Sequence, residues 1–286
     1  MKKVVVLVGP TASGKTRLSL EIAKSLNLEI INGDSVQIYQ ELNIGSAKAN
    51  PEERQMVKHH LLDLKKAGES YTVYDYQKDV RNLINQIDYP FIVGGSGFYI
   101  KSSLYDYEFN YEDQKAINYP LDYEEIIDYI KINDPNLKID FNNQRRVLRA
   151  YEQLLNGEIP SKKTSKNDPL YDLLILYLDY PRDKQKAKMI ERVEKQIEEG
   201  FIEEVQNLRE KAIYIDDIIG YREINLYLDQ KISLKEAKEL IVKKTFQFSK
   251  RQKTWFINQM KPVILDAMSP DLIADGIKLV KEFLNL

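Results

Sequence analysis

The feature that most constrains the fold is an eight-residue run near the start of the chain, Gly9-Pro10-Thr11-Ala12-Ser13-Gly14-Lys15-Thr16. It fits the pattern G-x-x-x-x-G-K-[ST], follows a predicted strand, Val4–Val8, and opens a predicted helix, Lys15–Ser25. In that setting backbone N–H groups converge on phosphate oxygens, and the helix N-terminus adds its positive dipole end. The alternative is a glycine-rich turn that caps a helix. We predict a loop that binds a diphosphate or triphosphate, with Lys15 at the outer phosphates and Thr16 on Mg²⁺.

Short apolar runs alternate with stretches of helical period, which is typical of an α/β fold with a parallel sheet. Together with the phosphate loop, this alternation predicts a P-loop NTPase-like parallel sheet flanked by helices. The expected strands are Val4–Val8, Glu29–Asn32, Phe91–Val93, Leu173–Leu178 and Val263–Leu265, and the expected helices are Lys15–Ser25, Tyr74–Ile87, Gln144–Leu155, Arg182–Lys211 and Leu234–Ile257.

One stretch of the chain differs in amino-acid composition from the rest. Residues 105–143 are rich in Tyr, Asp and Asn and contain only a short helical pattern, Tyr123–Ile132. We therefore expect a P-loop core (1–104), a short inserted helical subdomain (105–143), and the remainder of the core with long C-terminal helices (144–286).

The composition excludes several classes of protein. The chain has no cysteine, so a disulfide framework and a thiolate zinc site are both impossible. Its 42 basic and 44 acidic residues nearly cancel, which argues against a wholly basic nucleic-acid binder but not against a local basic face. No apolar run approaches the roughly 18 residues of a membrane span. We expect a cytoplasmic protein that does not bind a membrane.

Two further predicted strands end in polar residues. The second runs into Asp34-Ser35-Val36-Gln37, and a carboxylate at this position lies in the ligand crevice of an open α/β sheet. There Asp34 could coordinate Mg²⁺ or accept a proton; the alternative is an Asx turn or helix cap. The third ends in Val93-Gly94-Gly95-Ser96-Gly97, without the aspartate that many phosphate-loop ATPases use for Mg²⁺. We expect Ser96 to present its hydroxyl to the crevice, unless these residues form a simple strand-to-helix turn.

Basic residues gather in two places. Arg145, Arg146 and Arg149 open a predicted helix at a spacing that suits phosphate contacts, or equally a solvated face paired with acids. Residues 243–253 hold five cations and no acid, with aromatic residues between them, and such a face beside a phosphate loop indicates a large polyanion. The only histidines, at 59 and 60, are adjacent and point in different directions on a helix or strand. A structural role is therefore favoured over a joint metal site.

Several motifs occur in a specific order along residues 4 to about 256. After Gly9–Thr16 they are Asp34-Ser35-Val36-Gln37-Ile38-Tyr39, Ile44-Gly45-Ser46-Ala47-Lys48, His59-His60-Leu61-Leu62-Asp63, Val93-Gly94-Gly95-Ser96-Gly97, Arg146-x-x-Arg149-Ala150, Glu199-Gly200-Phe201, Ile219-Gly220-Tyr221-Arg222-Glu223 and Lys250-Arg251-Gln252-x-Thr254-Trp255-Phe256. This combination resembles the bacterial tRNA dimethylallyltransferase family. The phosphate loop alone is shared by many families, whereas the whole set is highly specific.

The resemblance implies a reaction. N6 of the adenosine immediately 3′ of the anticodon in certain tRNAs attacks C1 of dimethylallyl diphosphate, and diphosphate leaves. In this family the phosphate loop, residues 9–16, holds the diphosphate rather than ATP. Lys15, Thr16 and Mg²⁺ would stabilise the charge that develops on the leaving group.

The resemblance also implies roles for individual residues. Asp34 would be the base near N6, because an aromatic amine is a poor nucleophile. Ser96 would act at the reacting centre, where the family usually has threonine, and Arg192 would contact the diphosphate. The segments that match the tRNA-contacting stretches of the family are Asp34, Ser35, Val36 and Gln37, and Arg145, Arg146, Val147, Leu148 and Arg149.

Three departures from the family pattern concern the grip on tRNA. Asn142-Asn143 stands where the family commonly has Asn-Asp, Phe246-Gln247 stands where it has an arginine pair, and residues 105–143 are short for its helical subdomain.

Other functions stay open at this point. They are a small-molecule kinase with ATP on the loop, an adenylate isopentenyltransferase that uses free nucleotide, and a regulatory module without chemistry. The basic helices favour the tRNA enzyme, because a free nucleotide would not need them. We expect a monomer with tRNA and dimethylallyl diphosphate as its partners.

Overall fold

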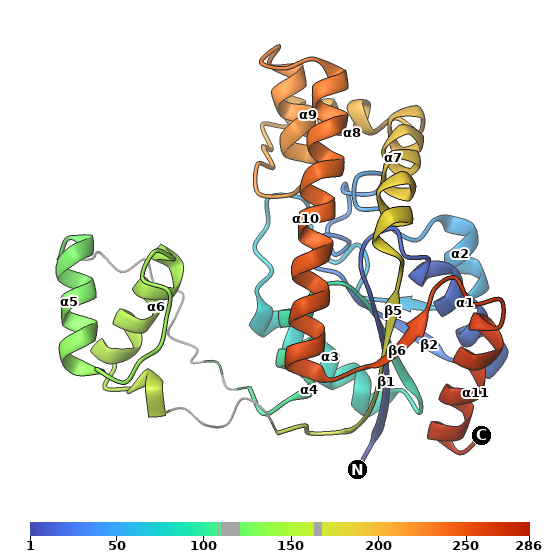
Figure 1. Ribbon diagram of the computed structural model, residues 1–286, viewed down its shortest axis with the longest axis horizontal. Coiled ribbons are helices and arrows are strands. Elements are labelled where there is room, and N and C mark those ends of the chain that lie inside the picture. Colours follow the sequence, from blue (N-terminus) through green and yellow to red (C-terminus); the bar gives the residue numbers. More distant parts are fainter. Residues whose placement is uncertain (108, 110–120, 163–167) are drawn as a thin grey trace. The chain divides into compact units, whose positions relative to one another are not determined.

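The computed structural model describes residues 1–107, 109, 121–162 and 168–286. Its centre is a six-stranded sheet of parallel pairings in the order β3-β2-β4-β1-β5-β6 (Figure 1). The predicted P-loop-like α/β class is therefore confirmed. The strands are β1 (Lys3–Val8), β2 (Glu29–Gly33), β3 (His59–His60), β4 (Pro90–Gly94), β5 (Asp172–Asp179) and β6 (Val263–Asp266).

Most of the remaining described residues form helices. Among the described residues none of them is long and apolar enough to cross a membrane. They are α1 (Lys15–Leu26), α2 (Pro51–Met56), α3 (Val73–Gln86), α4 (Gly97–Leu104), α5 (Tyr123–Asn133), α6 (Gln144–Leu155), α7 (Arg182–Glu198), α8 (Phe201–Glu210), α9 (Tyr221–Leu228), α10 (Leu234–Met260) and α11 (Leu272–Leu284), with a 3-10 turn at Pro160–Lys162.

The five predicted strands are all present, each longer than predicted by one or two residues at its ends. The short edge strand β3 is not predicted, because two histidines carry no apolar pattern. A single helix over 182–211 is also wrong. Gly200 adopts a left-handed conformation (φ 99°) and separates α7 from α8.

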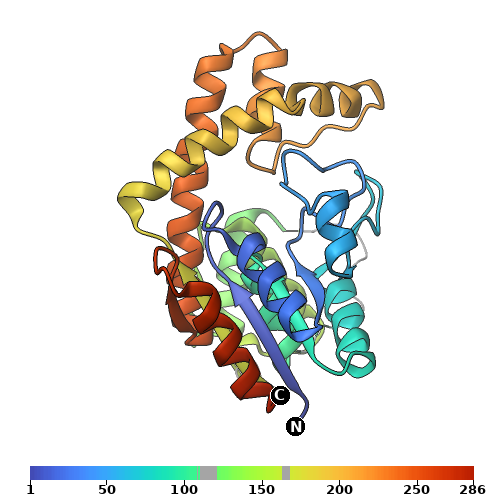
Figure 2. The same cartoon turned by 90° about the vertical axis from the view of Figure 1, so that its right-hand side faces the viewer.

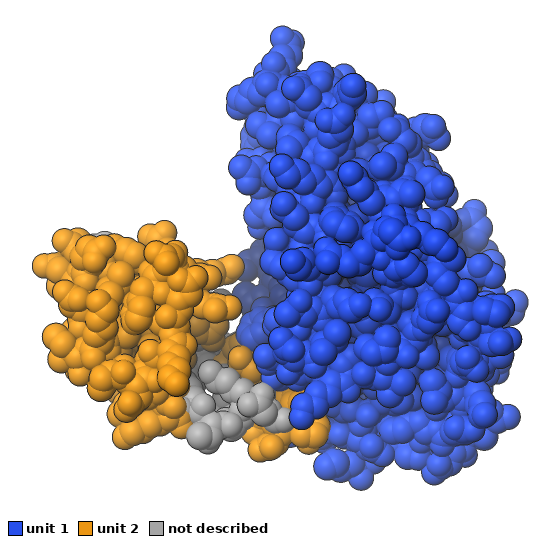
Figure 3. All heavy atoms as spheres, in the orientation of Figure 1, with its two compact units in different colours: residues 1–104, 170–286 blue, residues 105–169 orange. Residues whose placement is uncertain are grey.

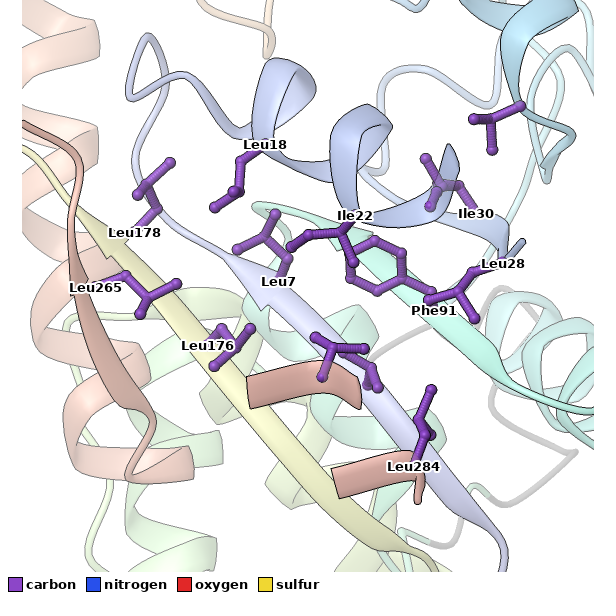
Figure 4. Close-up of a cluster of buried hydrophobic side chains, with 14 residues drawn as sticks. Leu7, Leu18, Ile22, Leu28, Ile30, Phe91, Leu176, Leu178, Leu265 and Leu284 are labelled. Atoms are coloured by element: carbon purple, nitrogen blue, oxygen red, sulfur yellow. The ribbon is translucent and has the colours of Figure 1, made fainter. Parts of the chain in front are cut away.

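The main core lies between the sheet and the α1–α11 pair, which lie side by side over one face (Figure 2). Leu7 and Leu176 of neighbouring strands belong to one buried cluster with Leu18 and Ile22 of α1 and Leu284 of α11 (Figure 4). The β1 residues before the phosphate loop, 4–8, are fully buried, as in a parallel strand with helices on both faces. The loop therefore starts from a rigid base.

The chain forms two compact units, residues 1–104 with 170–286 and residues 105–169 (Figure 3). The second unit begins where the insertion is predicted to begin, but it ends at Pro169 rather than Asn143. The predicted boundary fails because α6 belongs with α5: Val147 and Ala150 are buried in one cluster with Ile126 and Ile130. Residues 108 and 110–120 of the predicted insertion lie outside the described residues.

Hydrogen bonds close the chain where the second unit leaves the first. The Leu170 N–H donates to the Leu104 carbonyl at 2.9 Å, within the first unit. Tyr105 and Pro169 form an isolated antiparallel bridge, within the second. The insertion therefore starts and ends at paired residues.

Candidate active site

The phosphate loop joins the central strand β1 to α1, with Gly14 as the N-cap residue of the helix. The N–H groups of Gly14, Lys15 and Thr16 find no acceptor among the described residues. At a helix N-terminus such unpaired donors, together with the macrodipole, form an anion-binding site. The structure thus places residues 9–16 in the geometry that the sequence predicts.

Lys15 folds back over its own loop. Its Nζ donates to the carbonyls of Gly9 at 2.8 Å and Pro10 at 2.7 Å. Burial lowers the pKa of Lys15 from 10.5 to about 8, the negative charge of Asp34 opposes this shift, and the positive charge of Arg192 adds to it. The three groups come from distant parts of the chain, and Arg192 lines the same pocket as Gly14 of the phosphate loop.

The carboxyl ends of β2 and β4 meet at two glycines. A Cβ atom on Gly94 would collide with the carbonyl group of Gly33, so only glycine fits at this contact. The close approach lets the Ser96 N–H donate to the Gly33 carbonyl at 3.0 Å. Asp34 and Ser96, the next polar residues of the two strands, are thereby held on one rim of the sheet.

Asp34 and Ser96 hold the turn that follows β2. Asp34 Oδ1 accepts the Val36 N–H at 2.9 Å, so the Asx turn considered above is present, while Oδ2 accepts no hydrogen bond from a described residue. The Ser96 hydroxyl accepts from the Ser35 N–H at 3.0 Å and lies 3.1 Å from the Ser35 hydroxyl. Burial and then the charge of Asp34 raise the pKa of Tyr76, which places that phenol nearby as well.

Arg192 comes from α7 and faces the same crevice. Burial lowers its pKa and the charge of Asp34 opposes that change. Arginine stays positively charged in spite of such a shift. Within the described part of the chain its guanidinium forms no ion pair and no hydrogen bond. A half-buried, unpaired guanidinium beside a phosphate loop is available for an anionic ligand.

A pocket of about 550 Å³ opens beside the phosphate loop. One wall, from α1 and α7, carries mostly basic residues together with Glu191, and the other is mostly apolar, from the segment between β6 and α11 and the first turn of α11. Its lining residues include Ala12, Ser13, Gly14, Arg17, Lys188, Arg192, Lys195, Met268, Leu272 and Ile273. Such a pocket suits a ligand with an anionic head and a small apolar tail.

Gln252 is a further candidate site residue. It belongs to the Lys250-Arg251-Gln252 motif, from which the sequence predicts no role for it. Its side chain is 8% exposed, and its Nε2 donates to the Gly95 carbonyl at 2.8 Å. Its Oε1 is buried with no hydrogen-bond partner among the described residues. An unpaired buried acceptor next to the Gly94–Ser96 turn is costly unless a ligand or water supplies a donor.

The donors present fit a magnesium ion. The Thr16 hydroxyl makes no hydrogen bond with a described residue, and oxygen ligands are those that Mg²⁺ prefers. In the described part of the chain no group of three acidic, histidine or cysteine side chains could hold a metal alone. Substrate phosphate oxygens would therefore supply part of the coordination, as Mg²⁺ sites commonly require.

The arginine helix α6 lies in the second unit. The side chains of Arg145, Arg146 and Arg149 are exposed, and Arg149 lies 5.9 Å from the centre of the Phe109 ring. Neither Arg145 nor Arg146 forms an ion pair with a described residue. Arg145 and Arg146 therefore do not form a face paired with acids among the described residues.

Val147, predicted with these arginines as a tRNA contact, is instead fully buried in the α5–α6 core. Its inclusion is wrong, because a residue without exposed surface cannot touch a ligand. Leu148 packs partly against the same core. Asn143, where the family commonly has aspartate, accepts the Arg146 N–H at 3.3 Å and caps the helix as an aspartate would.

Two other motifs have structural roles. His59 hydrogen-bonds to the Val57 carbonyl and His60 to Glu29, so the two imidazoles serve different partners, as expected. The ammonium of Lys48 is almost fully buried and donates to Asp63 at 2.7 Å and to carbonyls of the loop before it. This ion pair fixes the loop that follows the Asp34 segment.

The fold and the convergence of Lys15, Asp34 and Arg192 define a class of protein, a P-loop enzyme that acts on a phosphorylated substrate. The model of the IPP transferase family matches residues 37–259. A tRNA dimethylallyltransferase from Acholeplasma laidlawii is 52% identical over 286 residues, 100% of both chains. The chain belongs to this family, and the resemblance seen in its sequence is confirmed.

Solved structures of similar fold support the same family membership. The tRNA isopentenylpyrophosphate transferase of Bacillus halodurans is 32% identical, with a TM-score of 0.76 over 100% of this chain and 97% of that one. A eukaryotic dimethylallyltransferase acting on tRNA is 26% identical, with a TM-score of 0.87 over 98% of this chain and 78% of that one.

Proposed function

We propose that the protein transfers a dimethylallyl group from dimethylallyl diphosphate to N6 of the adenosine immediately 3′ of the anticodon in certain tRNAs. The observation that carries this function is the phosphate loop with its unpaired N–H groups, beside which Arg192 lines a pocket and Asp34 is held on the rim of the same sheet. Two cations and unpaired N–H groups suit a leaving diphosphate, and one carboxylate suits a base. The relatives named above, which act on tRNA, support the choice of acceptor.

The reaction forms the N6–C1 bond and breaks the bond between C1 and the diphosphate oxygen. The electron pair leaves with diphosphate, where Lys15, Arg192 and the loop N–H groups stabilise the added charge. Asp34 Oδ2 takes the proton from N6. Mg²⁺ on the Thr16 hydroxyl, when bound, would neutralise charge on the diphosphate oxygens. The target base leaves its stack to reach the crevice.

The tRNA would be held mainly through its phosphates. Segment 34–37 contacts the acceptor near the reacting atoms, and Arg145, Arg146 and Arg149 contact the backbone. Lys244 and Lys253 of α10 are ion-paired with Glu223 and Asp179, so the exposed cations of the stretch 243–253 that would add to tRNA binding are Lys243, Lys250 and Arg251. The cytoplasmic location and the monomeric state expected from the sequence stay predictions.

The test is an incubation of the protein with labelled dimethylallyl diphosphate, Mg²⁺ and either unmodified tRNA or AMP. Label on tRNA, absent with Lys15→Ala, supports the proposal. Label on AMP instead would identify an adenylate isopentenyltransferase. Consumption of ATP with phosphorylation of an acceptor would identify a kinase.

A further inference from the structure

The loop Asn43–Ala47 is held by a carboxylate from another part of the chain. Glu204 of α8 accepts the backbone N–H groups of Asn43, Ile44 and Gly45 at 3.0, 2.8 and 3.1 Å. It also accepts the hydroxyl of Tyr221 at 2.6 Å. Four donors thus converge on one half-buried side chain. Charge-assisted hydrogen bonds of this kind are about twice as strong as neutral ones.

Glu204 has no ion pair with a described residue, so the loop N–H groups are its main partners. Glu223 makes an instructive contrast. That carboxylate is fully buried, accepts the Gly220 N–H at the start of its own helix, and pairs with Lys244 at 2.6 Å. Glu223 therefore fixes one helix to another, whereas Glu204 fixes a helix to a loop.

Two further contacts complete this attachment. Gln196 Nε2 donates to the carbonyls of Ile44 and Gly45 at 2.6 and 3.1 Å. A Cβ atom on Gly45 would overlap the rings of Phe201 and Tyr221, so the loop backbone lies directly on α8 and α9. We call Gln196, Glu204 and Tyr221 the loop latch.

The latch touches both sides of the crevice. Gln196 lies four residues after Arg192 on α7, and residues at this spacing share a helix face. On the other side, Gln37 Nε2 donates to the carbonyls of Ser46 and Ala47, both at 3.2 Å. The loop therefore connects the helix that carries Arg192 to the segment that carries Asp34.

We propose that Glu204 is a positioning residue: through the 43–47 loop it sets segment 34–37, and with it Asp34, against Arg192. The effect of Glu204 on catalysis rests on the proposed function, whereas its contacts with the 43–47 loop do not. The phosphate loop follows β1 and leads into α1, whose core does not include the latch, and only Ala12 of the loop packs against the cluster that contains Phe201 and Tyr221. Loosening the latch should therefore disturb the acceptor side of the reaction more than the donor side.

The test compares Glu204→Gln with Glu203→Gln, a matched change at the exposed neighbouring position. The amide of glutamine keeps one acceptor oxygen where the carboxylate has two. We expect Glu204→Gln to raise the KM for tRNA about tenfold and to lower kcat by a similar factor, with the KM for dimethylallyl diphosphate unchanged within twofold. Glu203→Gln should match the wild type. A loss of folded protein alone would lower kcat and leave both KM values unchanged.

A double-mutant cycle tests the route. If Glu204 acts through Gln37, the effects of Glu204→Gln and Gln37→Ala on the KM for tRNA should combine to less than their product. Independent, multiplicative effects, or a wild-type KM in Glu204→Gln, would overturn the proposal.

Hydrogen exchange separates the latch from the proposed function. In the wild type the amides of residues 43–45 should be protected, and Glu204→Gln should speed their exchange at least tenfold. Unchanged exchange would refute the latch in an active enzyme. If the wild type did not prenylate tRNA, the proposed function would be wrong. Faster exchange in Glu204→Gln would still establish the contact between Glu204 and the 43–47 loop.

Discussion

The phosphate-loop crevice and the arginine helix α6 both carry several cations, but they are built in opposite ways. Lys15 and Arg192 come from distant parts of the chain and are half-buried, and the charge of Asp34 opposes the effect of burial on the pKa of each. Arg145 and Arg146 come from one turn of one helix and stand in solvent. Charges in a shielded cluster act as a unit, whereas exposed charges act separately and are screened by salt.

The largest effect should follow from the one carboxylate of the cluster. Asp34→Asn should lower turnover by roughly 10²- to 10⁴-fold, the usual range for a general acid–base group, and leave diphosphate affinity nearly unchanged. Single-turnover kinetics and diphosphate titration measure the two quantities. Glu21→Gln, an exposed carboxylate on α1, is the control. A wild-type rate would exclude Asp34 as the base, and loss of Mg²⁺-dependent diphosphate binding would make it a metal ligand instead.

The second-largest effect should follow from removing the lysine of the phosphate loop. Lys15→Ala should weaken diphosphate binding by about 10- to 100-fold, since a charge-assisted hydrogen bond contributes about 1.5–3 kcal/mol, and it should slow transfer as well. Isothermal titration with diphosphate measures the first effect, with Lys24→Ala on the exposed face of α1 as control. Equal affinity in Lys15→Ala and the wild type would mean that the ammonium does not meet the ligand.

The arginine helix should respond differently. Changing Arg145, Arg146 and Arg149 together to Ala should weaken tRNA binding roughly tenfold, alike for all tRNA sequences. It should also flatten the dependence of log K on log salt by up to about one unit per lost phosphate contact. Filter binding at several salt concentrations measures both, and affinity for dimethylallyl diphosphate should hardly change.

The control for this triple variant is Lys278→Ala with Lys281→Ala, which removes exposed charge from α11. If the triple variant kept the salt dependence and the tRNA affinity of the wild type, α6 would be excluded from the tRNA-binding site. Residues 243–253 would then become the main candidate.

The smallest effect is a pH dependence that only the shielded region should show. With its pKa near 8, Lys15 is protonated and positive below that pH and loses its charge as the pH rises through it. Diphosphate affinity should therefore fall above pH 8, by at most tenfold per pH unit. Lys15→Met, titrated in parallel, corrects for the ionisation of diphosphate itself. A flat difference between the two proteins from pH 7 to 9.5 would contradict the shifted pKa.

How far the sequence predicts this site depends on how local each signal is. Lys15 and Asp34 follow directly from buried strands, and the sheet brings their strand ends together, so both are predictable. Arg192 has no local signal, and only the family resemblance indicates it. The latch residue Glu204 lies some 160 positions from the loop it holds, and no periodicity relates the two segments.

Val147 is a miss that the sequence could have avoided. At 100° per residue it lies on the opposite face of α6 from Arg145 and Arg149, which is where a core residue belongs. Reading a continuous segment as a binding stretch ignores that rotation. The predicted end of the insertion at Asn143 is wrong for another reason. The side-chain contacts that join α6 to α5, and so assign α6 to the second unit, follow no distinctive sequence pattern.

The paired residues at the base of the insertion have a consequence for how this chain can evolve. Leu104 and Leu170 are hydrogen-bonded, so the sheet meets the insertion as a closed loop. The entropy of closing a loop grows only logarithmically, by about 0.6 kcal/mol for each doubling of its length. Lengthening or trimming residues 105–169 therefore costs the catalytic unit little.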